Sequence, residues 1–264
     1  MALEDVCSFK ERSVQHKWFS FSSLGDAAIP FPMSDHYNLR YSRLETSENN
    51  CGVPLPFRLA HGTTTLGFIF QGGVIAAADT RASAGGLVAC PAVHKITPIH
   101  SHLVVTSSGS GADCMLWERI LIREIRLYQL RHGHRLSIRA TAKLLSSMLH
   151  PFKGTEMCVA LTLCGWDKQE GLIYVCSDGA RLQGDVFSVG SGSPYAYGVL
   201  DRELRWSLSK GEAISLAREA VFRATHRDAY SGNNVDLFHI TAQGWIIVVI
   251  WYKKPHKQLY SCRN

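Results

Sequence analysis

The 264-residue sequence lacks an apolar run long enough to cross a membrane. Its longest such run, residues 245–252, falls far short of the roughly 20 residues that a membrane-spanning helix needs. No positively charged start leads into an apolar stretch, so the sequence gives no signal-peptide pattern. It therefore predicts a soluble protein with no membrane partner.

The sequence also lacks the charge and cysteine patterns of several binding classes. Lys and Arg number 28 against 22 Asp and Glu, but the basic residues are scattered, which disfavours nucleic acid as a partner. The densest basic cluster, residues 253–257, is interpreted as an ordinary solvated end. The eight cysteines include no CxxC pair, and several lie in apolar strands. They are expected to be reduced and buried in a cytosolic protein.

Three common active-site patterns are absent or incomplete. Gly109 and Gly111 match the first two positions of G-x-G-x-x-G, but Cys114 occupies the third and no acidic partner follows in a βαβ unit. Ser191 lies between two glycines without forming the G-x-S-x-G nucleophile elbow. The 12 histidines lack a Cys or carboxylate at ligand spacing. No metal and no cofactor are expected.

Clear secondary-structure signals begin at Thr63. Two β-branched, apolar strands meet at a Gly72-Gly73 hairpin, and a strand at 103–106 leads into a long helix from about Ala112. The apolar face of that helix is predicted to include Leu116, Ile120, Ile125 and Leu127. Further expected elements are a helix capped by Ser137, strands at 158–164 and 172–176, short strands up to 189, a helix opened by a Ser209–Glu212 capping box, and strands at 235–241 and 245–251. This order predicts antiparallel sheets with helices packed outside.

The first 62 residues differ from the rest, because Ser, Pro and aromatic residues are spread through them without a period. Such a leader is either a poorly ordered arm or a segment that is removed. Composition alone does not separate these two interpretations, and the residues that follow the leader decide between them.

One ordered set of residues carries the chemical signal: Gly62-Thr63-Thr64-Thr65, Asp79-Thr80-Arg81, Lys95, and the run 226–232. Each piece alone is ordinary. Their order, with the runs LAHGTTTLGF, AADTRA, SVGSGS, AYGVLD and HRDAYSG, closely resembles the catalytic beta subunits of the proteasome, which are N-terminal-nucleophile hydrolases. The resemblance covers essentially residues 63–264, and its last two runs are most similar to the chymotrypsin-like, beta-five class.

The resemblance implies an α+β fold, a four-layer αββα sandwich in which two antiparallel sheets lie between helix layers. It implies that residues 1–62 are a propeptide removed by autolysis between Gly62 and Thr63, which leaves 63–264 as the catalytic domain. It also implies that the partners are other alpha and beta proteasome subunits in a stack of seven-membered rings. Peptides would be the substrates, and the location would be the cytoplasm and nucleus.

The same resemblance assigns the catalytic roles. Cleavage before Thr63, the nucleophile, would free an α-amine that titrates near about 7.7 to 8.0 and can exchange protons with the hydroxyl. Lys95 would lower the pKa of that hydroxyl, and Asp79 would hold the ammonium in place. The backbone N–H of Gly109 matches the oxyanion donor. The group that orients the new amine matches Ser191, Asp228 and Ser231.

The substrate pocket is also assigned by resemblance, to Ala82, Ser83, Val93, Thr97, Ser107, Gly111 and Met115. Ser83 and Gly111 would pair with the substrate backbone as an added strand. Ser107-Ser108-Gly109-Ser110 stands where the common beta-five pattern is Met-Ala-Gly-Gly. Losing a fully buried Met removes apolar contact worth about 1.5 to 3 kcal/mol. The more hydrophilic pocket resembles that of the thymus-specific beta-five form, which is associated with peptides for MHC class I presentation and CD8 T-cell positive selection.

Other interpretations remain open. The chain could be a divergent housekeeping or interferon-induced beta-five subunit. It could be a catalytically silent ring subunit, although such subunits lack the Thr or the Lys that this sequence has at positions 63 and 95. A more remote alternative is a free-standing amidohydrolase that acts on a small amide.

Overall fold

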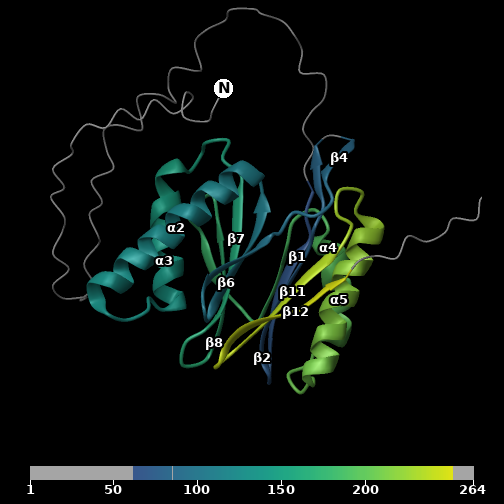
Figure 1. The fold of residues 1–264 in the computed structure, drawn as a ribbon. Coiled ribbons are helices and arrows are strands. Elements are labelled where there is room, and N and C mark those ends of the chain that lie inside the picture. The colour runs from purple at the N-terminus through teal and green to yellow at the C-terminus, as the bar shows by residue number, and fades with distance from the viewer. Residues whose placement is uncertain (1–61, 85, 252–264) are drawn as a thin grey trace, which may run out of the picture. The chain divides into compact units, whose positions relative to one another are not determined.

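The structure, a computed structural model, describes residues 62–84 and 86–251. The predicted leader up to residue 61, the basic tail cluster, Cys7, Cys51 and Cys262 lie outside the described residues. The described elements form four layers, with two five-stranded sheets between two pairs of helices (Figure 1). This arrangement confirms the expected α+β, four-layer αββα sandwich.

The first sheet contains the strand that begins two residues after Thr63. Its order is β10-β1-β2-β11-β12, and each neighbouring pair is antiparallel. The strands are β1 (Thr65–Phe70), β2 (Gly73–Asp79), β10 (Val186–Val189), β11 (Val235–Thr241) and β12 (Gly244–Trp251). The predicted hairpin joins β1 to β2, and Gly73 adopts a φ of 121° beside the Ile240 carbonyl, where a side chain would clash.

The second sheet supplies the other half of the central sandwich. Its antiparallel order is β5-β6-β7-β8-β9. The strands are β5 (Ile96–His100), β6 (Leu103–Gly109), β7 (Val159–Trp166), β8 (Glu170–Cys176) and β9 (Arg181–Gln183). A separate two-stranded sheet pairs β3 (Ala82–Ala84) with β4 (Leu87–Cys90). Sequence analysis did not predict β3, β4 or β5.

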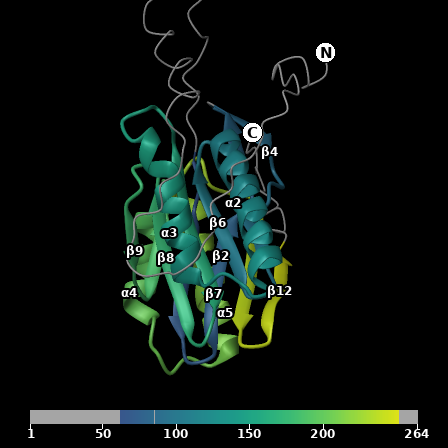
Figure 2. The same ribbon diagram turned by 90° about the vertical axis from the view of Figure 1, so that its left-hand side faces the viewer.

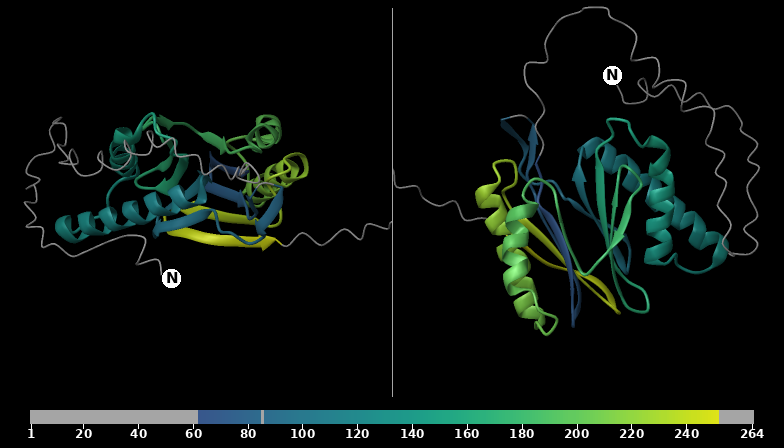
Figure 3. Two further views of the ribbon diagram at one scale, coloured as in Figure 1. Left: turned by 90° about the horizontal axis from the view of Figure 1, so that it is seen from above. Right: turned by 180° about the vertical axis from the view of Figure 1, so that it is seen from behind.

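Helices cover the outer face of each large sheet (Figures 2 and 3). Two of them, α2 (Gly111–His132) and α3 (Ile138–Leu149), pack with the second sheet, and a short 3-10 turn, η2 (His150–Phe152), follows. The other two, α4 (Ser193–Glu203) and α5 (Lys210–Arg227), pack on the first sheet. Between the sheets, a third apolar cluster includes the fully buried Val74, Val104 and Leu172. Each sheet is thus apolar on both faces.

The predicted helix caps are present. Ser137 Oγ accepts a hydrogen bond from the Ala140 N–H at 3.2 Å, and α3 ends at Leu149, before Pro151. At the start of α5, Ser209 and Glu212 form the reciprocal capping box, with distances of 3.3 and 2.8 Å. These bonds satisfy backbone donors that a helix leaves free at its first turn.

The predicted apolar face of α2 is wrong at Leu116, which is 55% exposed. The buried apolar residues of this helix are Cys114, Trp117, Leu121 and Ile125. Because consecutive helical residues are about 100° apart, a stripe centred on Trp117 and Leu121 turns Leu116 away from the sheet. The predicted Ile125 is buried and the predicted Ile120 and Leu127 are half-buried, so the prediction fails at Leu116 alone.

Two further expectations require correction. Sequence analysis did not predict helix α4, whose glycines at 192 and 198 and Pro194 weaken the local helix signal. Packing of Ala196 and Leu200 against the first sheet stabilises it. The expected burial of the cysteines is confirmed for Cys114 and Cys164, whereas Cys90 and Cys176 are half-buried and Cys158, which precedes β7, is exposed.

Candidate active site

Three predicted side chains meet at the start of the first sheet. Lys95 Nζ donates hydrogen bonds to Thr63 Oγ1 at 3.1 Å and to Asp79 Oδ1 at 2.7 Å. Thr63 lies just before β1, Asp79 ends the antiparallel neighbour β2, and Lys95 directly precedes β5 of the second sheet. All three are buried. The two sheets therefore bring an ammonium and a carboxylate to one threonine hydroxyl.

Asp79 is held by four donors. Its Oδ1 accepts from Lys95 Nζ and from the Thr64 N–H at 2.9 Å. Its Oδ2 accepts from the Gly232 N–H at 2.9 Å and the Arg81 N–H at 3.2 Å. The carboxylate is completely buried, and this set of donors compensates its desolvation. Asp79 thus fixes the position of Lys95 rather than facing a ligand.

The electrostatic environment of Lys95 works in two directions. Burial lowers the pKa of its ammonium, since removal from water disfavours the charged form. The attraction and hydrogen bond of Asp79 oppose this shift, with a smaller contribution from Asp228. The net effect is a pKa below the usual lysine value, so at a given pH a larger fraction of this amine is neutral than in an exposed lysine.

A second hydrogen-bond chain meets the backbone nitrogen of Thr63. That N–H donates to Ser191 Oγ at 3.1 Å, and Ser191 Oγ donates to Asp228 Oδ2 at 2.6 Å. Ser231 Oγ donates to the same carboxylate oxygen at 2.6 Å and accepts from Thr64 Oγ1 at 2.8 Å. The structure therefore brings together the predicted amine-orienting residues at the atom that would become the α-amine.

The loop 190–192 encloses the Thr63 backbone. Gly190 has a φ of 104°, and a side chain there would clash with the Thr63 carbonyl. The Gly192 N–H donates to that carbonyl at 3.2 Å, and a side chain on Gly192 would clash with Thr64 Oγ1. Glycine is required at both positions by close approach. The sequence motif around Ser191 is thus a clamp on Thr63.

The bond predicted to be cut lies directly at the hydroxyl. Thr63 Oγ1 donates a hydrogen bond to the Gly62 carbonyl oxygen at 2.8 Å. A side chain at Gly62 would clash with Tyr230 and approach Ser191 Oγ to 2.9 Å. Glycine therefore allows the carbonyl that precedes Thr63 to lie next to its hydroxyl.

Gly109, the predicted oxyanion donor, ends β6 with a φ of 115°. A side chain there would clash with the Cys158 carbonyl, so this conformation and close approach require glycine. The hydroxyls of Ser108 and Thr65 lie 3.1 Å apart and join this segment to β1. The loop that carries Gly109 is thus tied to the strand that follows Thr63.

The predicted substrate-binding residues come from four elements. Ala82 and Ser83 lie on β3, which pairs only with β4 among the described residues. Ser83 Oγ donates to the Tyr230 carbonyl at 3.0 Å, so its hydroxyl is already engaged. The other members are the half-buried Val93, Thr97 on β5, Ser107 on β6, and the exposed Gly111 and Met115 on α2.

Sequence analysis missed one polar residue of this region, Glu118. It is only 7% exposed, and its Oε2 accepts a hydrogen bond from Thr97 Oγ1 at 2.8 Å. Gly111, Met115 and Glu118 stand at i, i+4 and i+7 on α2, so they share one helix face. That spacing, applied to the two pocket residues of the helix, would have identified Glu118.

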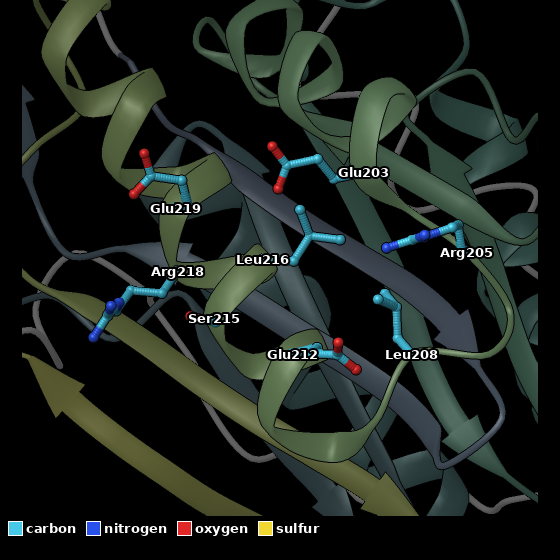
Figure 4. A pocket seen from close by; sticks show the side chains of 8 residues that line it. All are labelled: Glu203, Arg205, Leu208, Glu212, Ser215, Leu216, Arg218 and Glu219. Carbon is cyan, nitrogen blue, oxygen red and sulfur yellow. The ribbon is translucent and has the colours of Figure 1, made fainter.

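A hollow of about 440 Å³ lies elsewhere, at the end of α4 and along α5 (Figure 4). Its lining is Glu203, Arg205, Leu208, Glu212, Ser215, Leu216, Arg218 and Glu219. It shares no residue with the Thr63 region. Within the described part of the chain, no group of three His, Cys, Asp or Glu side chains is placed to hold a metal ion. No helix in residues 62–84 and 86–251 is long and apolar enough to span a membrane.

The sandwich of two antiparallel sheets between helix layers is the fold of the N-terminal-nucleophile hydrolases. The chain belongs to the proteasome subunit family, whose model matches residues 59–240. It is 51% identical over 191 residues to "Proteasome subunit beta type-8" of Rattus norvegicus, covering 72% of this chain and 69% of that protein. It is 43% identical over 241 residues to "Probable proteasome subunit beta type-5" of Schizosaccharomyces pombe, covering 88% and 87%. The Gallus gallus "Proteasome subunit beta type-5" is 46% identical over 198 residues, covering 74% and 77%. These relatives support the beta-five class.

Proposed function

We propose that this chain is a threonine-type endopeptidase subunit whose nucleophile is Thr63. The observation that carries the proposal is the contact of Thr63 Oγ1 with Lys95 Nζ at 3.1 Å, beside the Asp79 carboxylate. A threonine hydroxyl is a weak nucleophile unless an adjacent group takes its proton or lowers its pKa. A buried ammonium at this distance favours the oxyanion form of the hydroxyl.

Removal of residues 1–62 is the activating step of the proposal. Thr63 Oγ1 attacks the Gly62 carbonyl carbon, which its hydroxyl already contacts through the carbonyl oxygen at 2.8 Å. The C–N bond before Thr63 breaks as an ester forms, and the hydroxyl proton passes to the nitrogen. Water then hydrolyses the ester, which releases the leader as a carboxylate and restores the hydroxyl. The product carries an α-amine at Thr63.

Peptide cleavage repeats this chemistry on a substrate. The new α-amine accepts the hydroxyl proton while Oγ1 attacks the substrate carbonyl, and it passes the proton to the leaving amine. Ser191 and Asp228 hold the amine, since they already bind the Thr63 nitrogen in the uncut chain. The Gly109 N–H would stabilise the oxyanion of the substrate. Water activated by the same amine then hydrolyses the acyl ester.

Membership of the proteasome subunit family supports the proposed assembly and location. We propose that the chain acts within the 20S core, together with other alpha and beta subunits in seven-membered rings. There it would cleave unfolded, ubiquitin-targeted proteins in the cytoplasm and nucleus. The exposed Leu87, Val88 and Trp206 offer apolar surface that neighbouring subunits could cover.

The thymus-specific form is proposed on the polarity of the substrate-binding residues. Ser107 replaces the Met of the common beta-five pattern, and Thr97 and Glu118 add a hydroxyl and a carboxyl beside it. A bulky apolar side chain of the substrate binds such a site less favourably than it binds an apolar pocket. The proposed role is to generate peptides for MHC class I presentation and CD8 T-cell positive selection. A divergent housekeeping or immune-type beta-five subunit is the alternative.

N-terminal sequencing of the chain from assembled particles tests the proposal. A mature start at Thr63, together with labelling of that residue by a threonine-directed electrophilic peptide, is expected. A mature chain that keeps its leader and resists labelling would instead indicate a silent ring subunit. Sizing of the native particle tests the alternative of a free-standing amidohydrolase, because such an enzyme would not elute at the size of a stack of rings.

A further inference from the structure

Glu118 is a buried carboxyl whose hydrogen-bonding capacity is only partly used. Its side chain is 7% exposed, and Oε2 accepts from Thr97 Oγ1 at 2.8 Å. Its Oε1 has no hydrogen-bond partner among the residues that the structure describes. Buried polar atoms are rarely left unpaired, because the loss of water is then uncompensated. Oε1 is therefore a buried oxygen with hydrogen-bonding capacity left, and the Ser107 hydroxyl is the group that acts on this carboxyl besides Thr97.

The surroundings of Glu118 connect it to the candidate active site. Thr97 lies on β5, two residues after Lys95, which directly precedes that strand. Ser107 pairs with Lys95 across the sheet, with a backbone bond of 2.9 Å, and its Oγ donates a long 3.4 Å bond to the Lys95 carbonyl. Thr97 Oγ1 donates to Oε2 of Glu118. The carboxyl of Glu118 thus interacts with Thr97 and Ser107, two of the predicted substrate-binding residues.

Burial raises the pKa of Glu118, and the hydroxyls of Thr97 and Ser107 oppose this shift only in part. Since Thr97 donates to Oε2, the second oxygen carries the proton in the neutral form and accepts bonds in the ionised form. A carboxamide has both a donor and an acceptor, so it pairs with either form. An unbranched alkyl chain of the same length pairs with neither.

Resting on the proposed function above, we propose that Glu118 determines substrate specificity by binding a carboxamide side chain, Gln or Asn, at the residue that precedes the cut. The half-buried Ser107 is the small side chain beside the carboxyl that a substrate amide would pass to reach the buried Oε1, and Thr97 orients the carboxyl. A methionine at position 107 would place a longer apolar side chain beside the carboxyl. In this proposal the polar pocket selects a substrate by a specific hydrogen bond to Glu118, and not only by offering less apolar surface.

The test uses assembled particles and two fluorogenic peptides that differ only in Gln or norleucine before the cut. In wild-type particles, kcat/KM for the Gln peptide is expected to exceed its value in Glu118→Met by about tenfold, while the norleucine value changes less than twofold. Glu118→Gln replaces the carboxyl by a carboxamide, which can still pair with the substrate amide. This variant is expected to retain most of the Gln preference. The matched control is Glu124→Met on the same helix, which lies beside Arg123 at the surface and should change neither rate.

The outcomes separate this inference from the proposed function. Equal losses for both peptides in Glu118→Met, or none, would show that Glu118 is only structural and would overturn the inference, while Thr63 labelling would leave the protease proposal intact. Absence of Thr63 labelling in wild-type particles would overturn the protease proposal itself. If Glu118→Met does not assemble, Thr97→Val tests the same contact, since it removes the bond that orients the carboxyl. A severalfold fall of the Gln-to-norleucine ratio supports the inference, and an unchanged ratio overturns it.

Discussion

Two buried carboxyl groups of this region, Asp79 and Glu118, differ sharply in how many hydrogen bonds they accept. Asp79 accepts four hydrogen bonds, all from this chain. Glu118 accepts one bond at Oε2, and its other oxygen has no partner among the described residues. A fully satisfied carboxylate fixes its neighbours in place. A partly satisfied one has capacity left for a ligand.

This difference separates two tasks in one region of the fold. The network of Asp79, Lys95 and Thr63 joins the last residue of β2 to residues just before β5 and β1. Each polar group in it already has a partner. The group of Thr97, Ser107 and Glu118 joins β5 and β6 to α2 and remains incomplete. Changes in the first network should therefore abolish chemistry, whereas changes in the second should alter which peptides are cut.

The largest expected effect is that of Thr63→Ala. It removes both the attacking oxygen and the contact with the Gly62 carbonyl. The leader should remain attached, and cleavage by this subunit should fall to background. Mass spectrometry of the chain from purified particles checks the first outcome, and peptide hydrolysis checks the second. Thr63→Ser is the matched control because it keeps a hydroxyl, and it should still be processed. A chain that begins at residue 63 in the alanine variant would contradict autolysis.

Lys95→Ala should come next in size. Expressed directly from Thr63, so that processing is not required, this variant lacks the ammonium 3.1 Å from the nucleophile. Loss of such a preorganised group costs about 10²- to 10³-fold in kcat. The measurement is kcat for a peptide that the wild-type subunit cleaves, with Lys143→Ala, an exposed lysine of α3, as the control. A loss of less than about tenfold, roughly 1.4 kcal/mol, would indicate a structural role only.

Ser107→Met should alter specificity rather than abolish activity. It adds an apolar side chain beside Thr97 and Glu118, and a gain of about 1 kcal/mol from its contacts corresponds to roughly fivefold faster cleavage after bulky apolar residues. Peptide cleavage by other subunits of the particle should not change. Steady-state kinetics on apolar and polar peptides measures the ratio. If wild-type particles already prefer the bulky apolar peptide as strongly as housekeeping particles do, the thymic assignment loses its main physical support.

The parts of the fold predicted from sequence are those governed by local rules. The Gly72-Gly73 hairpin and the caps at Ser137 and Ser209 depend on residues within a few positions of one another, and all three are present. Helix α4 was missed because its stability comes from packing of Ala196 and Leu200 on the first sheet, which local propensity does not reveal.

In the candidate site, too, the residues that sequence motifs identify differ from those that depend on tertiary contacts. The resemblance named Thr63, Asp79 and Lys95, which the structure brings within hydrogen-bond distance, but their separation along the chain gives no distance in space. Glu118 was missed because a glutamate on a helix is usually exposed. Its burial depends on Thr97 from another strand, a tertiary contact that helical spacing only suggests.

The smallest expected effect concerns pH and sharpens the contrast between the two carboxyl groups. Because burial raises the pKa of Glu118, its carboxyl ionises only as the pH rises above the ordinary value of 4.5. The surrounding hydroxyls of Thr97 and Ser107 do not titrate in this range, and the pKa of the nearby Cys114 thiol is raised to about 12. Lys95 also titrates in this region, with a pKa below the usual lysine value, but it is present in the Glu118→Gln variant as well as in the wild type. Ionisation of Glu118 should favour a cationic side chain.

The test compares kcat/KM for two peptides that carry Lys or Gln before the cut. In wild-type particles, the Lys-to-Gln ratio of kcat/KM should rise with pH by about two- to threefold, the effect of a weak ion pair. Both peptides use the same nucleophile, so titration of the Thr63 amine cancels in the ratio. Glu118→Gln cannot ionise at this position and should lose the rise that is specific to the wild type. A ratio that rises equally in Glu118→Gln would assign the pH dependence to another group and remove Glu118 from the contact with substrate.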